Sequence, residues 1–190
     1  MKNKIFSLIV LSIISLIVSG CGSSSNAASQ NDESQEKVED FELYDGEPLI
    51  IGVIGEVPNI DEHQITFNIL TFKDLLQGDL ENLYDAILID KDNLIEASQN
   101  DYSEVYTNSN IPFLFVESSK NHLPFIDSEK DYNDEAFKEM EDNLTYITLY
   151  SNRGELEDEY VGYSLYNDEM TETNKKEVYS RAFKTIETLK

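Results

Sequence analysis

The chain has 190 residues, and its 14 basic and 38 acidic residues give a formal net charge of −24 at pH 7. This charge argues against binding to nucleic acid, or to anionic lipid head groups, through the protein surface, because like charges repel. The chain holds one cysteine and two histidines, which excludes an internal disulfide and leaves no self-evident cysteine or histidine metal cluster.

The first 20 residues have the pattern of a secretory signal peptide. Two lysines precede an apolar run over residues 5–18, which is interrupted only by serines, and Ser19 and Gly20 lead into Cys21. As a helix this run would span about 21 Å, which is short of the ~30 Å hydrocarbon core of a bilayer. The length therefore favours a cleaved signal over a membrane span.

The end of this segment, Val18-Ser19-Gly20-Cys21, resembles the lipobox of bacterial lipoproteins. The resemblance implies that the thiol of Cys21 carries diacylglycerol and that the chain is cleaved in front of Cys21. Two acyl chains would then anchor the protein stably to the extracytoplasmic face of the cell membrane. The alternative is ordinary secretion with a free cysteine. Without the two lysines of the signal peptide, 12 basic and 38 acidic residues give the mature chain a net charge of −26.

Residues 22–40 are rich in Ser, Asn, Gln, Asp and Glu and nearly free of large apolar side chains. Such a segment cannot bury enough surface to offset its chain entropy, so with the lipidated cysteine we expect residues 21–40 to form a disordered tether. A flexible chain of this length reaches about 25 Å. Residues 41–190 then form one domain of common size.

The first half of this domain alternates apolar runs with helical patterns. A continuous apolar run of four to six residues rich in β-branched side chains is typical of a strand buried on both faces. The patterns predict strands over 49–54, 65–72, 86–89 and 111–116, a helix over 73–83 that Gly78 weakens, and a helix that begins at Asp92 or Asn93 and ends at 108–110, with Leu94, Ile95, Ser98, Tyr102, Val105 and Tyr106 on its apolar face.

The second half predicts an antiparallel hairpin and a long last helix. We expect an apolar loop over 123–125, a short acidic helix that is capped by Asn133 or Asp134 and runs to Met140, strands over 144–150 and 160–166 around a turn at 152–154, and a helix from Thr171 or Thr173 to Leu189. The last helix has an apolar stripe at three-four spacing. The stripe is expected to face the core, with a partner-binding helix as the alternative; it consists of Val178, Tyr179, Ala182, Phe183 and Ile186.

Strands that alternate with helices predict parallel pairing. The expected fold is therefore α/β, a single Rossmann-like three-layer domain with a mostly parallel sheet and a C-terminal antiparallel hairpin. Residues 83–116 loosely resemble one half-motif of periplasmic sugar-binding and related type I binding proteins, through Tyr84-Asp85-Ala86-Ile87 and Ile111-Pro112. Those proteins bind their ligand between two lobes, whereas this chain has room for one, so the resemblance assigns no binding residue.

Candidate site residues follow the predicted strands, because ligands of open parallel sheets bind outside the carboxyl ends of the strands. Glu56, Asp90 and Glu117 stand at three such ends and predict a site for Mg²⁺ or Ca²⁺. A carboxylate pair there could instead do acid–base chemistry. Acids are one residue in five, so chance placement is the third interpretation. The same edge is expected to include Asp92, Lys120, His122, Asn152 and Arg153.

Five tyrosines gather in the predicted hairpin, at positions 146, 150, 160, 163 and 166. They indicate either an exposed groove or cross-strand aromatic packing. The sequence has neither a G-x-G-x-x-G motif nor a G-x-S-x-G motif, so we expect no cofactor and no enzymatic activity. The expected function is that of a lipid-anchored accessory or interaction module with a protein partner. The alternative is a protein that binds a small ligand or a divalent cation.

Overall fold

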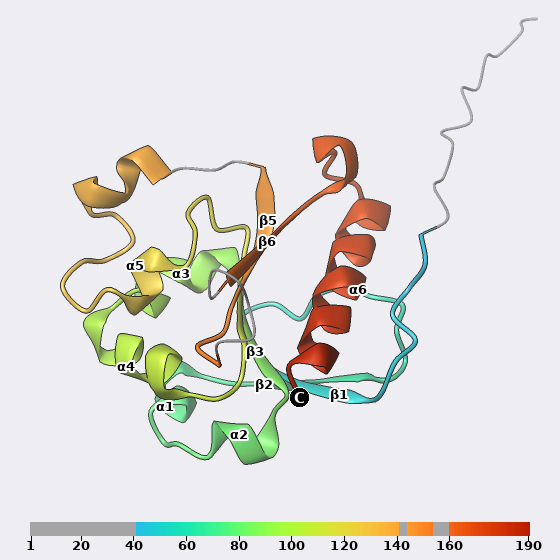
Figure 1. Ribbon diagram of the computed structural model, residues 1–190, viewed down its shortest axis with the longest axis horizontal. Helices are drawn as coiled ribbons and strands as arrows, with labels where there is room; N and C mark the ends of the chain where they lie inside the picture. Colours follow the sequence, from blue (N-terminus) through green and yellow to red (C-terminus); the bar gives the residue numbers. More distant parts are fainter. Residues whose placement is uncertain (1–40, 141–143, 154–159) are drawn as a thin grey trace, which may run out of the picture. The chain divides into compact units, whose positions relative to one another are not determined.

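A six-stranded sheet in the order β2-β1-β3-β4-β5-β6 forms the centre of the computed structural model, which describes residues 41–140, 144–153 and 160–190 (Figure 1). The predicted signal peptide, Cys21 and the predicted tether lie outside the described residues. In the part that is described, no helix has the length and apolar character needed to cross a membrane. The strands are β1 (Leu49–Ile54), β2 (Ile65–Ile69), β3 (Ala86–Ile89), β4 (Phe113–Val116), β5 (Thr145–Tyr150) and β6 (Tyr160–Ser164).

The sheet is parallel from β2 to β4 and antiparallel from β4 to β6. One row of paired residues, Val53, Leu88, Leu114 and Leu149, runs across its four central strands on a single face. The predicted α/β fold, with a mostly parallel sheet and a C-terminal antiparallel hairpin, is therefore confirmed.

Helices cover both faces of the sheet, so each face has its own apolar core. The long helix α6 lies on one face and the short helices α1 to α5 lie on the other (Figure 1). The α-helices are α1 (Phe72–Leu75), α2 (Leu80–Leu83), α3 (Leu94–Ala97), α4 (Asn100–Asn108), α5 (Leu123–Ile126) and α6 (Glu172–Thr188). The 3₁₀ helices are η1 (Lys91–Asn93), η2 (Glu135–Met140) and η3 (Tyr166–Asp168).

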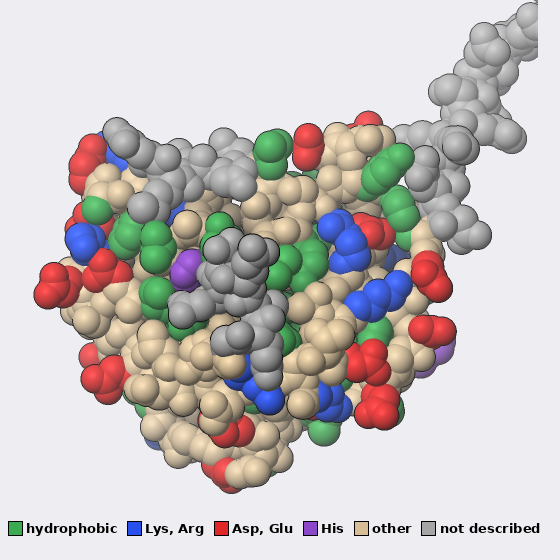
Figure 2. Space-filling model, in the orientation of Figure 1, with side chains coloured by type: hydrophobic (Ala, Val, Ile, Leu, Met, Phe, Trp, Pro, Cys, Tyr) green, Lys and Arg blue, Asp and Glu red, His purple; other side chains and the backbone are tan. Residues whose placement is uncertain are grey.

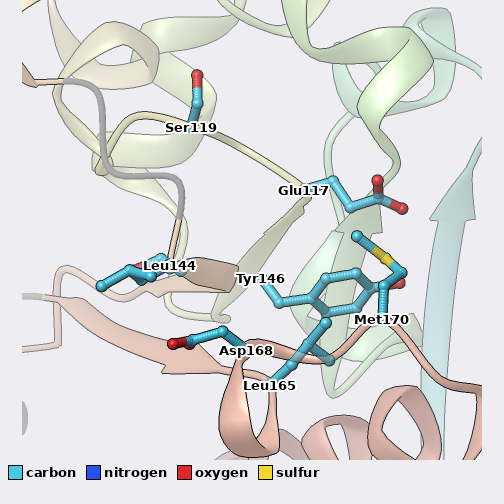
Figure 3. A pocket seen from close by; sticks show the side chains of 8 residues that line it. Glu117, Ser119, Leu144, Tyr146, Leu165, Asp168 and Met170 are labelled. Atoms are coloured by element: carbon cyan, nitrogen blue, oxygen red, sulfur yellow. The ribbon is translucent and has the colours of Figure 1, made fainter.

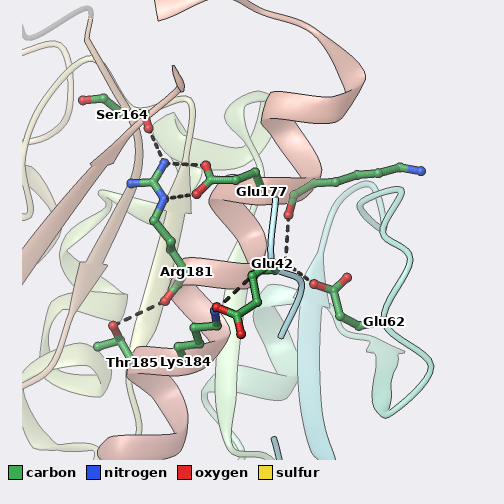
Figure 4. A network of polar contacts seen from close by, with 9 residues as sticks. Glu42, Glu62, Ser164, Glu177, Arg181, Lys184 and Thr185 are labelled. Carbon is green, nitrogen blue, oxygen red and sulfur yellow. Dashed lines mark hydrogen bonds and ion pairs between the residues drawn. The ribbon is translucent and has the colours of Figure 1, made fainter. Parts of the chain in front are cut away.

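Helix α6 begins after Thr171, whose hydroxyl accepts a hydrogen bond from the Asn174 amide (3.1 Å). The predicted apolar stripe is fully buried against the sheet, so its core-facing role is confirmed. Polar contacts fasten the rest of the helix to its surroundings (Figure 4). Arg181 binds the Glu177 carboxylate (2.6 Å) and the Ser164 carbonyl of β6 (2.6 Å).

The described chain begins beside α6. The ring of Phe41 packs edge-on against Tyr166 of η3, with 5.4 Å between ring centroids. Tyr44 is buried against Phe183 of α6, and the Lys184 ammonium group contacts the backbone carbonyl of Glu42. Residues 41–47 therefore follow α6 from its N-terminal end before the chain enters β1.

The predicted helix over 73–83 is wrong. The backbone turns left-handed at Gly78 (φ +78°) and Asp79 (φ +66°), which no α-helix permits, so α1 and α2 are separate four-residue helices. The preceding strand ends at Ile69 rather than at residue 72, because Thr71 caps α1: its amide donates to the Asp74 carboxylate (2.7 Å).

The predicted helix from Asp92 or Asn93 is also broken, into η1, α3 and α4. Gln99 is extended (ψ 146°), and the hydroxyl of Ser98 accepts a hydrogen bond from the distant Tyr132 amide (2.7 Å). Ile95, expected on the apolar face, is 57% exposed.

Four smaller differences concern the bounds or type of elements. β4 begins at residue 113 rather than 111, and β6 ends at 164 rather than 166. Residues 123–126 form the short helix α5 where a loop was expected, with Pro124 in the first turn, a position that needs no amide donor. The acidic helix that ends at residue 140 is the 3₁₀ helix η2 rather than an α-helix; it begins directly after Asp134, one of the two predicted caps, whose carboxylate accepts a hydrogen bond from the Ala136 amide (2.8 Å).

Candidate functional site

The carboxyl ends of β1, β3 and β4 lie at one edge of the sheet, because these strands are parallel. After β1 the chain crosses to β2 over the α6 face, where Ile60 packs into the core and Asp61 pairs with Lys176 of α6 (2.7 Å). After β3 it turns to the opposite face, where Leu94 of α3 is buried. Connections that diverge in this way leave a crevice, which is where open α/β sheets bind ligands.

A pocket of about 260 Å³, here called the strand-end pocket, occupies this crevice. The three residues predicted as metal ligands, Glu56, Asp90 and Glu117, all line it, and so does Asp92. Its remaining lining residues are Val57, Pro58, Asn59, Lys91, Val116, Tyr146, Glu172, Lys175 and Tyr179. The sequence therefore identified the right edge and four of the five carboxylates of the pocket, and it missed Glu172 and the other contributions of β5 and α6.

Sharing a pocket does not make these acids a metal site. Among the described residues, no group of three or more His, Cys, Asp or Glu side chains is placed so that it could hold a metal ion. A metal role for Glu56, Asp90 and Glu117 stays a prediction. Their individual contacts show what each carboxylate does in this conformation.

Asp90 fastens β3 to the turn after β1. One carboxylate oxygen accepts a hydrogen bond from the Glu56 amide (2.7 Å), and the other accepts one from the Asn93 side-chain amide (2.6 Å). Gly55 permits this contact because it has φ +109° and no side chain; a Cβ there would lie 2.1 Å from an Asp90 oxygen. The Asp90 carboxylate is thus committed to backbone and side-chain donors of its own domain.

Glu117 is placed differently, at a left-handed backbone position (φ +54°) directly after β4. Its amide donates to the Tyr146 carbonyl of β5 (2.6 Å), and its carboxylate pairs with Lys91 (3.3 Å). The hydrogen bond and charge of Glu117 raise the pKa of the Lys91 ammonium group. The Glu117 side chain is 25% exposed, so its carboxylate remains accessible at the pocket mouth.

Tyr146 reaches this edge through an irregularity in β5. The pairing of β5 with β6 shifts between Thr145 and Ile147, the signature of a β-bulge. Strict alternation would place Tyr146 with Tyr150, on the face of α1 to α5; instead it joins the core on the α6 face, edge-on to Tyr179 with 6.2 Å between ring centroids. A bulge re-aims a side chain in this way, and a sequence pattern does not reveal it.

The two phenols of the strand-end pocket stay protonated at neutral pH. Burial, and then the charge of Glu117, raise the pKa of Tyr146 to about 12. Burial and the neighbouring Tyr146 raise the pKa of Tyr179 further. These hydroxyls can donate hydrogen bonds, but they cannot act as bases.

A second pocket of about 200 Å³, here called the hairpin pocket, lies next to the first, with Glu117 and Tyr146 as the common wall. Figure 3 shows the Tyr146 ring close to Leu165 and Met170, with the Glu117 carboxylate nearby. Leu144 and Met170 are 57% and 60% exposed. Ser119, Thr145 and Asp168 complete the lining.

The charge of the two pockets is strongly negative. Together they contain six carboxylates and two lysines, and both lysines are paired, Lys91 with Glu117 and Lys175 with Glu172 (3.1 Å). The hydrogen bond from Lys175 lowers the pKa of Glu172. On the face seen in Figure 2, carboxylates also surround the periphery, and hydrophobic side chains show at the upper edge, over the start of β5.

Four other residues expected at this edge lie elsewhere. β5 is antiparallel to β4, so Asn152 and Arg153 are at the opposite edge, where they donate to the carbonyls of Thr107 and Leu189. The chain after β4 buries the other two beneath its own loop. Lys120 donates to the Tyr132 carbonyl, and His122 stacks on Tyr150 with 5.3 Å between ring centroids.

The hairpin tyrosines mostly pack against neighbouring side chains. Tyr150 is paired with Tyr160 across β5 and β6, and Tyr163 is buried and donates to the Thr185 hydroxyl of α6 (2.6 Å). Cross-strand pairing thus accounts for Tyr150 and Tyr160 and contact with α6 for Tyr163, whereas Tyr146 lines both pockets and Tyr166 of η3 is 41% exposed. Comparisons of this chain with protein-family models, with curated proteins and with solved structures found no match.

Proposed function

We propose that the protein is a lipid-anchored module on the extracytoplasmic face of the cell membrane, that it binds a partner through the carboxyl edge of its sheet, and that it has no catalytic activity of its own. The observation that carries this proposal is the pair of adjoining pockets at that edge, one rich in carboxylates and the other bordered by the exposed apolar side chains of Leu144 and Met170. The anchor rests on the lipobox that ends at Cys21.

Exposed apolar side chains at this edge favour a macromolecular partner. Val57, Leu144, Tyr166 and Met170, which lie in or next to the two pockets, are four of the ten large hydrophobic residues that are exposed in the described part of the chain. Their exposed fractions are 39%, 57%, 41% and 60%. Apolar side chains gathered beside a polar rim are typical of protein interaction sites.

The contacts of the site side chains support a binding role over a catalytic one. Asp90 uses both carboxylate oxygens to hold its own domain together. Tyr146 has its pKa raised to about 12, so it does not serve as a base at neutral pH. A general base needs an acceptor atom that can reach the substrate; both oxygens of Asp90 already accept hydrogen bonds within the domain, and Tyr146 keeps its proton.

Site-specific photo-crosslinking in intact cells tests the binding role. A photoreactive amino acid replaces Leu144 or Met170 in the full chain, and the matched control replaces Ile95 of α3, which has the same 57% exposure as Leu144 but lies on the α1-to-α5 face. We expect a discrete crosslinked product from positions 144 and 170 and none from position 95. Equal products from all three positions, or none from any, would contradict the proposal.

The anchor has its own test. In a Cys21→Ala variant the protein should appear in the medium or remain an uncleaved precursor, because no thiol remains to carry the lipid. Membrane material that is still lipid-labelled in this variant would show that Cys21 is not the attachment point.

Divalent-cation binding is the second candidate, favoured by the five carboxylates of the strand-end pocket. Extracellular Ca²⁺ sites are often weak, with dissociation constants of ~10⁻⁴–10⁻³ M. A ligand at 100 times its dissociation constant stabilises a protein by ~2.7 kcal/mol. Thermal unfolding with and without Ca²⁺ or Mg²⁺ therefore decides the matter, and an unchanged melting temperature at ~100 mM metal, about 100 times the weakest of these constants, would exclude this candidate.

A further inference from the structure

We propose that the partner held by these two pockets is a basic polypeptide segment that carries a large apolar side chain and lies close to the membrane surface, as the juxtamembrane segment of a membrane protein does. This inference deepens the proposed function and rests on it. Three features of the carboxyl edge support it: an apolar recess, an excess of negative charge, and the position of Phe41.

The hairpin pocket supplies the apolar recess. Its floor is made by Tyr146 and Leu165, which are 6% and 8% exposed, and its rim by Leu144 and Met170, which are 57% and 60% exposed. A recess of about 200 Å³ with such walls accepts a large apolar side chain and is too small for a folded element. The expected occupant is thus an anchoring side chain on a chain segment, as at the centres of many protein interfaces.

The charge around this recess selects a cationic segment. Six carboxylates line the two pockets, and the two lysines among them already have acidic partners in Glu117 and Glu172. A basic segment is attracted to such an edge, whereas an acidic peptide or a phosphate group is repelled. The same charge prevents the edge from resting on anionic lipid head groups, so the lipid surface itself is not the occupant.

The third feature is the position of Phe41. Its ring packs against Tyr166 at 5.4 Å, and Tyr166 opens η3, whose residue Asp168 lines the hairpin pocket. Phe41 therefore lies beside the 3₁₀ helix that borders the hairpin pocket. The predicted tether, residues 22–40, directly precedes Phe41 in the sequence, and a flexible chain of this length has a root-mean-square end-to-end distance of about 25 Å. With lipid on Cys21, the carboxyl edge would work close to the membrane, within reach of a juxtamembrane segment.

Peptide binding tests the chemistry of the occupant. The full chain, held in phosphatidylcholine vesicles, is titrated with three labelled synthetic peptides of equal length: one that alternates Leu and Lys, one with Glu in place of Lys, and one with Ser in place of Leu. We expect the Leu–Lys peptide to bind at least tenfold more tightly than the other two, and its affinity to fall severalfold between low and high salt because charges are screened. Equal binding of the Glu peptide would overturn the charge requirement, and equal binding of the Ser peptide would overturn the apolar anchor.

Substitutions at the rim of the hairpin pocket test where the peptide binds. Met170→Glu and Leu144→Glu place a charge at the rim of the recess, and each should weaken binding of the Leu–Lys peptide at least tenfold. Ile95→Glu makes the same change at an equally exposed position on the other face and should leave the affinity unchanged. Equal affinities in all variants would show that the peptide binds through the overall charge of the protein and would overturn the proposed site.

The proposed location of the partner close to the membrane is tested in intact cells. A second copy of residues 22–40, inserted after Asp40, doubles the predicted tether, and this should at least halve the crosslinking yield from position 144 while leaving peptide affinity unchanged. An unchanged yield would overturn the juxtamembrane location. A failure of the peptide experiment with crosslinks still present would reject a basic partner but keep the interaction module, whereas loss of all crosslinks would reject the module itself.

Discussion

The carboxyl edge of the sheet has two regions that use the same kind of residue in different ways. Where β1 and β3 end, Asp90 is enclosed by the Glu56 amide and the Asn93 side chain. Where β4 ends and β5 begins, the Glu117 amide binds the Tyr146 carbonyl, its carboxylate contacts the exposed Lys91 and the Tyr146 hydroxyl, and two pockets open beside it. The first region, here called the closed region, joins two strands. The second, here called the open region, presents a surface.

The backbone, rather than the type of side chain, makes this difference. Gly55 has no side chain, so the turn after β1 can bring its amides against Asp90. At the other region, the bulge before Ile147 moves Tyr146 to the α6 face, and the left-handed Glu117 directs its amide to the Tyr146 carbonyl. A carboxylate at a strand end is therefore available to a ligand only where neighbouring donors do not already satisfy it.

The largest expected effect is at the closed region. Gly55→Ala forces a Cβ into Asp90 at a backbone angle that side chains rarely adopt, and we expect the free energy of unfolding to fall by roughly 2–4 kcal/mol in urea denaturation. The control is Gly78→Ala, which has a similar backbone angle (φ +78°) but nothing within 4 Å of the added Cβ, and which should cost about 1 kcal/mol. Equal losses would show that backbone strain alone, and not the contact with Asp90, explains the result.

The next largest effect on stability is expected from substitution of the two carboxylates, Asp90 and Glu117. Asp90→Ala leaves two donors without their acceptor and should lower the free energy of unfolding by about 1–3 kcal/mol. Glu117→Ala removes an ion pair with a 56% exposed lysine and should cost less than about 1 kcal/mol. Urea denaturation of both variants, with Asp92→Ala as the control for loss of one charge at the same edge, measures the difference. A Glu117 variant that is the less stable of the two would reverse the comparison.

The sequence predicted the parts of the fold that a local pattern of apolar residues specifies. The six apolar residues of β1 and the stripe from Val178 to Ile186 need no knowledge of their neighbours, because an apolar run or a helical period already specifies which side is buried. The predicted helix over 73–83 failed because Asp79 adopts a left-handed backbone, which a non-glycine residue rarely does.

The same reasoning explains what was found and missed at the site. Parallel strands bring their ends together, so Glu56, Asp90 and Glu117 could be predicted to share an edge. The break at Ser98 depends on a hydrogen bond from Tyr132, 34 residues later, and the side on which Tyr146 lies depends on a bulge. Neither leaves a local pattern in the sequence.

A smaller effect concerns the phenol at the open region. Tyr146→Phe keeps the ring and removes the hydroxyl, so at neutral pH it should cost about 1 kcal/mol. The pKa of Tyr146 is raised from 10.0 to about 12 in the folded protein, so this residue contributes stability that is fully present below pH 10 and lost as the pH rises to 12. Urea denaturation across this range should show a slope that is shallower in the variant by up to about 1.4 kcal/mol per pH unit. Parallel curves would mean that the hydroxyl faces water.

The smallest effect on stability is expected at Lys91, where the two regions meet. Its side chain is 56% exposed and its pair with Glu117 is 3.3 Å long, so Lys91→Ala should change the free energy of unfolding by less than about 0.5 kcal/mol. The affinity for a basic peptide should change more than the stability does, because Lys91→Ala frees the Glu117 carboxylate and makes the strand-end pocket more negative. Affinity for the Leu–Lys peptide should therefore rise severalfold in Lys91→Ala and fall in Glu117→Gln, with Lys138→Ala of η2, a similarly exposed lysine that lines neither pocket, as the matched control. If Lys91→Ala and Lys138→Ala raise the affinity equally, net charge and not the open region governs binding.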